Sequence, residues 1–479
     1  MRNLLRSTFL MFGFLIVLSS AIFGQNAQNK TIEGHWLGAI EFGGTKLRLV
    51  LKVTKNADGT FSAKFDSPDQ GANNLPLDSI AQQAKTVTFA GKAYGLSYEG
   101  MLNEAGDEIT GTLKQGQGVL PLVFKRTTET VKLNRPQDPS KPYPYDEEDV
   151  VYENKADNVK LAGTLTVPRG AKTSPAVILI TGSGAQDRNE TIFGHRPFLV
   201  LADHLTRRGI AVLRVDDRGI GGSSAGAPTA TTENFAADVL AGIEFLKTRK
   251  EINPKQIGLI GHSEGGMVAP MVAARSKDAA FIVLMAGLGQ TGEDALYSQT
   301  ELLQKAEGVS PETTKQTKAA LKNIFTILRT EKDNKIAEQK IRETIEKQKS
   351  VMSDEGRLEF APVEATFKAQ TPMYLTQWFR YFVAFNPRPT LEKVKVPVLA
   401  LNGENDLQVA PKENLSLIEA GIKAGGNKDV TIVSLPKLNH LFQTSEKGTL
   451  AEYGKIEETI APIALETISN WILKRTTGK

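Results

Sequence analysis

The stretch that decides the fold is Gln256-Ile257-Gly258-Leu259-Ile260-Gly261-His262-Ser263-Glu264-Gly265. Its first half is short and mostly apolar, which is typical of a strand buried in a parallel sheet. The alanine-rich residues that follow, 266–274, predict a helix. Gly261 and Gly265 indicate a sharp turn between the two, where neighbouring backbone leaves no room for larger side chains. Such a turn lifts Ser263 out of the sheet and directs the first N–H groups of the helix at the space above it.

A serine hydroxyl becomes a nucleophile when a base lies beside it, and this chain has five histidines. Four of them are set aside by their position. His262 adjoins the serine but points to the other side of the turn, and His35 lies in a separate N-terminal segment. The other two, His195 and His204, lie upstream, around an early helix. His440 is left as the candidate base. It follows a predicted strand at 430–433 and precedes a predicted helix near 457–474.

The acid that orients the base is expected between Ser263 and His440, after one further strand. Residues 396–401 predict that strand, and a turn follows it. Asp406 in this turn is the predicted acid, with Glu404 as the alternative. The order Ser, Asp, His, each beyond its own strand, matches the α/β-hydrolase arrangement and differs from the orders of trypsin and subtilisin.

The chain resembles serine hydrolases of the α/β-hydrolase superfamily, especially secreted bacterial carboxylesterases with an added N-terminal domain. The resemblance covers roughly 146–479 and rests on the serine, acid and histidine motifs together with two further stretches. These stretches are Val177-Ile178-Leu179-Ile180-Thr181-Gly182-Ser183-Gly184-Ala185-Gln186-Asp187-Arg188-Asn189-Glu190 and Val212-Leu213-Arg214-Val215-Asp216-Asp217-Arg218-Gly219-Ile220-Gly221-Gly222-Ser223-Ser224. The first resembles a strand and oxyanion loop, with Thr181 where such esterases commonly have histidine. In the second, Asp217 and Arg218 are interpreted as structural.

The resemblance implies an α/β fold, a mostly parallel sheet flanked by helices, with a helical cap insertion and an N-terminal antiparallel β domain. It implies a serine hydrolase that cleaves small-molecule carboxylic esters through an acyl-enzyme on Ser263, with His440 as base and Asp406 as orienting acid. The oxyanion hole would use the main-chain N–H of Glu264 and that of Ser183 or Gly184. No metal or organic cofactor is expected.

Residues 1–24 are predicted to be a secretory signal peptide. Arg2 and Arg6 precede an apolar run from 9 to 18, which is short for a membrane span, and small residues follow it. Export to the periplasm or the extracellular space is therefore expected, with no stable membrane span after cleavage. Removing the two arginines leaves 56 Lys and Arg against 54 Asp and Glu, so the charge balance favours no nucleic-acid partner. The chain has no cysteine, which excludes disulfides.

Four further segments are expected. Alternating apolar and polar residues at 25–130 predict a β-rich, barrel-like domain. Its interior could hold a hydrophobic ligand, but filling by its own side chains is favoured. A proline-rich linker, 131–145, leads to the catalytic domain, 146–479. Helical spacing at about 288–388 predicts the cap over the serine, with a solvated helical appendage as the alternative.

Other functions remain open at this stage. A serine peptidase of the prolyl-oligopeptidase type shares the same order of catalytic residues, but the region before the catalytic domain lacks the repeats of a propeller. An acyl thioesterase is a further hydrolase alternative. A lipid- or glycan-binding protein with a vestigial hydrolase domain is an alternative from another class. The oligomeric state is left open.

Overall fold

The computed structural model describes residues 31–42, 45–68, 72–115, 118–128 and 133–477. The predicted signal peptide, 1–24, lies outside the described residues. The chain forms two compact units. The β unit contains the described residues up to Asn134 together with Ile192–His195, and the α/β unit contains Arg135–Thr191 and Arg196–Lys479. Within the described residues, no helix combines the length and apolarity needed to cross a bilayer.

The β unit is a nine-stranded antiparallel sheet with the order β4-β3-β2-β1-β9-β8-β7-β6-β5. Its elements are β1 (Gly34–Phe42), β2 (Thr45–Lys55), β3 (Phe61–Ser67), β4 (Ala72–Pro76), β5 (Ser79–Gln83), β6 (Thr86–Gly91), the 3-10 turn η2 (Lys92–Tyr94), β7 (Leu96–Leu102), β8 (Glu108–Gln115) and β9 (Gly118–Thr127). Strands that are adjacent in this order are also consecutive in the sequence, except for β1 and β9. The sheet curves until β3 contacts β5.

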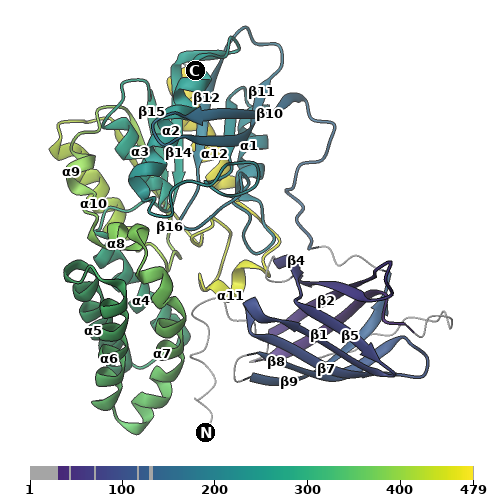
Figure 1. The fold of residues 1–479 in the computed structure, drawn as a ribbon. Coiled ribbons are helices and arrows are strands. Elements are labelled where there is room, and N and C mark those ends of the chain that lie inside the picture. Colours follow the sequence, from purple (N-terminus) through teal and green to yellow (C-terminus); the bar gives the residue numbers. More distant parts are fainter. Residues whose placement is uncertain (1–30, 43–44, 69–71, 116–117, 129–132, 478–479) are drawn as a thin grey trace. The chain divides into compact units, whose positions relative to one another are not determined.

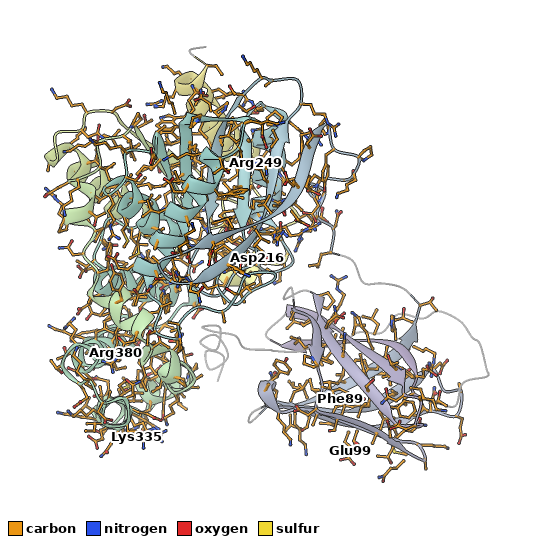
Figure 2. All side chains as sticks on the ribbon, turned by 45° about the horizontal axis from the view of Figure 1, so that its top comes forward. Phe89, Glu99, Asp216, Arg249, Lys335 and Arg380 are labelled. Atoms are coloured by element: carbon orange, nitrogen blue, oxygen red, sulfur yellow. The ribbon has the colours of Figure 1, made fainter. Side chains whose placement is uncertain are left out.

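Aromatic side chains fill the interior of the β unit. Along β7, buried residues alternate with exposed ones, so that Tyr98 faces inward and Glu99 outward (Figure 2). Phe89 stacks on Tyr98 with ring centroids 4.9 Å apart, and Phe124 meets the Tyr98 ring edge-on at 5.4 Å. The Tyr98 hydroxyl lies within hydrogen-bonding distance of the main-chain oxygen of Leu122, at 3.0 Å. The favoured interpretation, strands packed around their own side chains, agrees with this core.

The α/β unit is built on an eight-stranded sheet with the order β10-β11-β13-β12-β14-β15-β16-β17. The strands are β10 (Tyr145–Asn154), β11 (Val159–Pro168), β12 (Ser174–Ile180), β13 (Ala211–Val215), β14 (Ile252–His262), β15 (Phe281–Met285), β16 (Val398–Gly403) and β17 (Val430–Leu435). β11 runs antiparallel to both of its neighbours, β10 and β13. The six strands β13, β12, β14, β15, β16 and β17 are parallel to one another. The carboxyl ends of these six strands therefore meet at one edge.

Helices cover both faces of this sheet (Figure 1). Residues of β12 alternate between the faces, with Ile178 in the core under α2, α3 and α10 and Val177 in the core under α1 and α12. These helices are α1 (Pro197–Arg207), α2 (Thr232–Lys247), α3 (Gly265–Ala273), α10 (Pro411–Ala424) and α12 (Pro462–Thr476), and the short α11 (Leu450–Tyr453) precedes α12. The last helix was expected from about 457. It starts at Pro462, because proline is accepted in the first helical turn but breaks a helix interior.

Helices are inserted between β15 and β16, in the region predicted as a cap. They are α4 (Gly292–Glu307), α5 (Pro311–Thr330), α6 (Asn334–Ser350), α7 (Asp354–Tyr374), α8 (Gln377–Ala384) and α9 (Arg388–Leu391). The residue before each of the helices α4 to α8 is a Thr, Ser or Asp, and its side chain accepts a hydrogen bond from a main-chain N–H of the first turn. α5, α6 and α7 share a core that includes Phe325, Ile341 and Phe360.

Part of the proline-rich segment is bound to the α/β unit. Arg135 donates to the main-chain oxygens of Ile456 and Gly454, at 3.0 and 2.9 Å. The side-chain amide of Gln137 donates to the main-chain oxygen of Ile460, at 2.7 Å. The segment from Arg135 onward is therefore attached to the α/β unit and is not a free linker.

The turn after β14 is as tight as the sequence indicates. A Cβ added at Gly261 would lie 2.0 Å from the main-chain oxygen of Gly265, and one added at Gly265 would lie 2.2 Å from that of Ile180. Ser263 between them has φ of +53°, in the left-handed region that side chains rarely adopt. Its N–H donates to the main-chain oxygen of Met285 at 2.9 Å. Backbone packing therefore holds the strained serine.

We expect Gly261→Ala to lower the free energy of unfolding by about 1–3 kcal/mol or more, because the added methyl meets rigid backbone. Gly356→Ala is the matched control, since its Cβ approaches only the Ser353 hydroxyl, at 3.2 Å, and the Met352 side chain. Chemical denaturation monitored by circular dichroism measures both. Equal stability of the two variants would contradict the steric account.

Candidate active site

Asp406 and His440 are hydrogen-bonded to each other. The Nδ1–H of His440 donates to Oδ2 of Asp406 at 2.8 Å, and both side chains are buried. The other oxygen, Oδ1, accepts from the main-chain N–H groups of Gln408 and Val409, at 2.7 and 2.9 Å. These bonds fix the carboxylate, and the carboxylate fixes the imidazole so that Nδ1 carries the proton and Nε2 is the basic nitrogen.

Glu404, the alternative acid, lies elsewhere. Its side chain is exposed and accepts a hydrogen bond from Ser434 at 3.2 Å. Of the two acids in this turn, Asp406 is the one that faces His440.

The three predicted residues follow parallel strands of one sheet, in which β15 lies between β14 and β16. Ser263 comes after β14, Asp406 after β16 and His440 after β17. The ring of His262, beside the serine, lies 4.8 Å from the ring of His440, measured between centroids. The nucleophile turn and the histidine loop are therefore packed against each other at the carboxyl edge of the sheet.

The predicted oxyanion loop follows β12 and passes close to the serine. A Cβ added at Gly182 would lie 3.3 Å from Cβ of Ser263. Gly184 has φ of +101°, a conformation open to glycine. The roles of Ser183, Gly184 and the N–H of Glu264 as oxyanion donors stay a prediction.

Asp217, in the turn after β13, supports this loop. The hydroxyl of Thr181 donates to its Oδ1 at 2.8 Å, and the main-chain N–H of Gln186 donates to its Oδ2 at 2.9 Å. Burial raises the pKa of Asp217 to about 7, although these two bonds lower it. Thr181 thus anchors the loop through Asp217. Arg218 donates to Asp238 at 2.8 Å, which agrees with its structural interpretation.

The side chain of Glu264, next to the serine, is enclosed and binds three separate segments. Its Oε1 accepts from the hydroxyl of Thr232 at 2.7 Å and from the indole N–H of Trp378 at 2.8 Å. An interaction with Ser183 of the oxyanion loop is also favourable to the charged form. Burial outweighs these contacts and raises the pKa of Glu264. Its Oε2 accepts no hydrogen bond from the described residues, so it is the oxygen that can carry a proton.

The aromatic residues near the end of the insertion divide into two groups. Tyr374 and Phe379 are buried in the core of the insertion. Phe382 packs with Met267 of α3, close to the nucleophile turn, and Trp378 packs against both this cluster and the core of the insertion. The latter pair therefore connects the insertion to the site.

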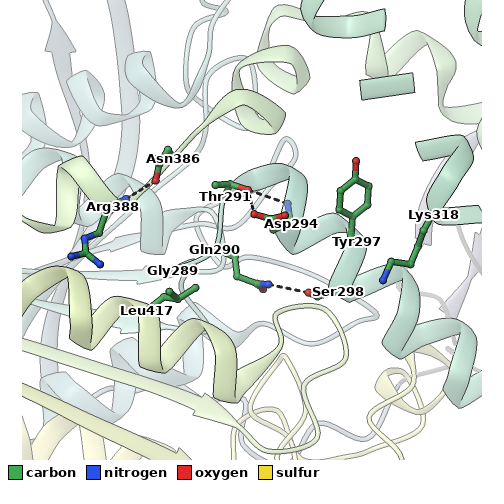
Figure 3. A pocket seen from close by; sticks show the side chains of 10 residues that line it. All are labelled: Gly289, Gln290, Thr291, Asp294, Tyr297, Ser298, Lys318, Asn386, Arg388 and Leu417. Carbon is green, nitrogen blue, oxygen red and sulfur yellow. Dashed lines mark hydrogen bonds between the residues drawn. The ribbon is translucent and has the colours of Figure 1, made fainter. Parts of the chain in front are cut away.

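A separate open hollow of about 490 Å³ lies at the start of α4 (Figure 3). It is lined by Gly289, Gln290, Thr291, Asp294, Tyr297, Ser298, Lys318, Asn386, Arg388 and Leu417. None of these is a predicted site residue. Among the described residues, no cluster of His, Cys, Asp or Glu has an arrangement that could hold a metal ion.

Sequence reasoning missed the partners that surround the serine. Glu190 accepts hydrogen bonds from His262 at 2.9 Å and from the main-chain N–H of Gly182 at 2.7 Å. Glu190 stands at the end of the quoted oxyanion stretch, which was the available signal. Trp378 and Thr232 carried no local signal, because their common partner Glu264 is distant in the sequence.

We expect stability to depend on pH through Glu264. Because its pKa is raised in the folded state, its contribution is complete below the unfolded pKa and is lost as pH rises through the folded one. Glu264→Gln keeps the Oε1 acceptor and cannot titrate. Its thermal unfolding temperature should therefore rise relative to that of the wild type as pH increases from about 4 to 9. Parallel curves would contradict a raised pKa.

The chain is similar to several known proteins. It is 25% identical over 367 residues, 76% of each chain, to esterase EstD of Thermotoga maritima. It is similar to the α/β-hydrolase GrgF from Penicillium sp. sh18 at 16% identity, covering 70% of this chain and all of that one, with a TM-score of 0.43. The Pyrococcus furiosus esterase Pf2001 is likewise similar at 16% identity, covering 69% of this chain and 93% of that one, with a TM-score of 0.40.

A family model matches residues 196–447, just over half of the chain. The matched region contains all three residues of the predicted triad and the helical insertion. With its mostly parallel sheet flanked by helices and its N-terminal antiparallel sheet, the chain is an α/β-hydrolase, and it belongs to the Hydrolase_4 family, described as serine aminopeptidase, S33.

Proposed function

We propose that this protein is an exported serine hydrolase that cleaves small-molecule carboxylic esters, with Ser263 as nucleophile, His440 as base and Asp406 as orienting acid. The observation that carries the proposal is the buried bond between Nδ1 of His440 and Oδ2 of Asp406, 2.8 Å long, beside the strained turn that holds Ser263. The similarity to an esterase over 76% of the chain also supports ester hydrolysis over the alternative functions.

The chemistry follows from these positions. Nε2 of His440 takes the proton of the Ser263 hydroxyl as its oxygen attacks the ester carbonyl. Asp406 stabilises the imidazolium that forms. The N–H of Glu264 and that of Ser183 or Gly184 bind the developing oxyanion, at about 3–4 kcal/mol per donor. His440 returns the proton to the departing alcohol, and water then hydrolyses the acyl-enzyme by the same steps in reverse.

A peptidase is the second candidate, because the description of the matching family is that of a serine aminopeptidase. Both reactions use the same triad and differ in the leaving group. Comparing aryl esters with aminoacyl anilides separates them, and efficient anilide cleavage with poor ester turnover would favour the peptidase.

Two parts of the proposal concern the surroundings of the site. The insertion is proposed to act as a cap, since Trp378 from α8 donates to Glu264 beside the nucleophile. Export is proposed from the apolar segment after Arg2 and Arg6. Sequencing the N-terminus of the protein recovered outside the cytoplasm tests it, and retention in the cytoplasm would contradict it.

Hydrolysis of p-nitrophenyl esters, from acetate to decanoate, tests the proposed function. We expect Ser263→Ala to lose at least about 10⁴-fold in kcat, because the nucleophile is removed. The chain length with the highest kcat/KM then measures the acyl pocket. Activity that persists in the variant would mean another nucleophile.

Asp406 and Glu404 provide a matched pair of acids in one turn. We expect Asp406→Asn to lower kcat by about 10³- to 10⁴-fold, because the amide no longer stabilises the imidazolium or holds its tautomer. Glu404→Gln should stay within about twofold of the wild type, since the side chain of Glu404 is exposed and accepts a hydrogen bond from Ser434, away from His440. The reverse result would assign the acid to Glu404.

A further inference from the structure

His262 lies between two hydrogen-bond acceptors. Its Nδ1 is 2.9 Å from Oε1 of Glu190, and its Nε2 is 3.0 Å from the main-chain oxygen of His440. A main-chain carbonyl can only accept, and Oε1 of Glu190 already accepts from the N–H of Gly182 at 2.7 Å. A neutral imidazole has one N–H, so it keeps both contacts only if Glu190 is a carboxylic acid that donates to Nδ1. With Glu190 as a carboxylate, the two contacts require a doubly protonated ring.

The surroundings of the ring favour this charge. Burial opposes the charged form of His262, but the charge and hydrogen bond of Glu190, the carbonyl of His440 and the charge of Asp406 outweigh burial and raise its pKa. The ring of His440 is the other titratable neighbour, 4.8 Å away. Asp217, in the turn after β13, is near enough for its charge to interact with that of Glu190. The ring of Phe442 packs edge-on against the ring of His262, with the centroids 6.3 Å apart.

This pair connects three loops of the proposed active site. Through Gly182, Glu190 holds the oxyanion loop after β12. His262 itself belongs to the nucleophile turn after β14, and its second N–H holds the histidine loop after β17. Both side chains are almost fully buried, with 3% of Glu190 and 5% of His262 exposed.

We propose that Glu190 and His262 form a buried ion pair that acts as a positioning device for the proposed acyl transfer, holding the main-chain carbonyl of His440 and the N–H of Gly182 in fixed relation to Ser263. The inference rests on the proposed function for its catalytic consequence. Glu190 and His262 act through these main-chain groups and are positioning residues, distinct from the base His440.

The pair predicts a specific dependence on pH. Below the raised pKa of His262, both N–H groups are present and the loops are held. As pH rises through that value, the ring loses one proton, and one of the two contacts is lost. The kcat/KM of the wild type should therefore fall on the alkaline side.

Two substitutions test this in the full chain with p-nitrophenyl acetate. In Glu190→Gln the carboxylate charge is absent, so the alkaline fall should move to lower pH. In His262→Gln the amide keeps a donor towards the carbonyl of His440 but cannot titrate, so the alkaline fall should disappear. In both variants the loops are held less well, so kcat should also fall, by up to about 10²-fold.

The control is His204→Gln, which replaces a partly buried histidine bound to Ser469 and outside the site. Its pH profile should equal that of the wild type. If Glu190→Gln and His262→Gln lower activity by the same factor at every pH, the pair has only a structural role and the proposal is overturned.

The charge of the ring can be read without any substrate. Nitrogen-15 NMR of the wild-type protein with labelled histidine should show two protonated ring nitrogens for His262 at pH values below the alkaline fall in kcat/KM. The signals are assigned by their loss in His262→Gln or by their shift in Glu190→Gln. An unprotonated nitrogen in His262 would overturn the ion pair. Absence of ester hydrolysis together with a doubly protonated ring would refute the proposed function and leave the ion pair standing.

Discussion

The site depends on the close approach of backbone at the turn between β14 and α3. Gly261 and Gly265 lie so near the main-chain oxygens of Gly265 and Ile180 that a methyl group at either would overlap them. This packing forces Ser263 to a positive φ, at +53°, and lifts it to the carboxyl edge of the sheet. The strain is tolerated because the parallel strands on both sides fix the ends of the turn.

Buried acids then fix the loops that meet at this turn. Asp217 binds Thr181 and the N–H of Gln186, while Asp406 binds His440 and two N–H groups of its own turn. Glu190 and Glu264 flank the serine and bind the oxyanion loop and the insertion, respectively. Asp217 holds the oxyanion loop, Asp406 holds the histidine loop and Glu264 holds the insertion, each from another segment. Such contacts make a site assembled from distant parts rigid.

The architecture and the candidate triad were readable from the sequence because their signals are local. An apolar run with glycines at fixed spacing identifies the nucleophile turn, and alternation of apolar residues identifies the β unit. The partners of His262 and Glu264 were not readable, because they lie 72 and 114 residues away and meet only when the loops fold. The predicted start of α12 near 457 was wrong, because Pro462 fits the first turn of a helix but not its interior.

A crystal structure of the protein after reaction with an alkyl phosphonate ester tests the central claim most directly, because the adduct mimics the tetrahedral intermediate. The account predicts phosphorus bonded to Oγ of Ser263, with the phosphoryl oxygen about 2.7–3.1 Å from the N–H of Glu264 and of a loop residue at 183 or 184. Nε2 of His440 should lie beside the bonded oxygen. An adduct on another residue, or a phosphoryl oxygen turned away from these N–H groups, would contradict it.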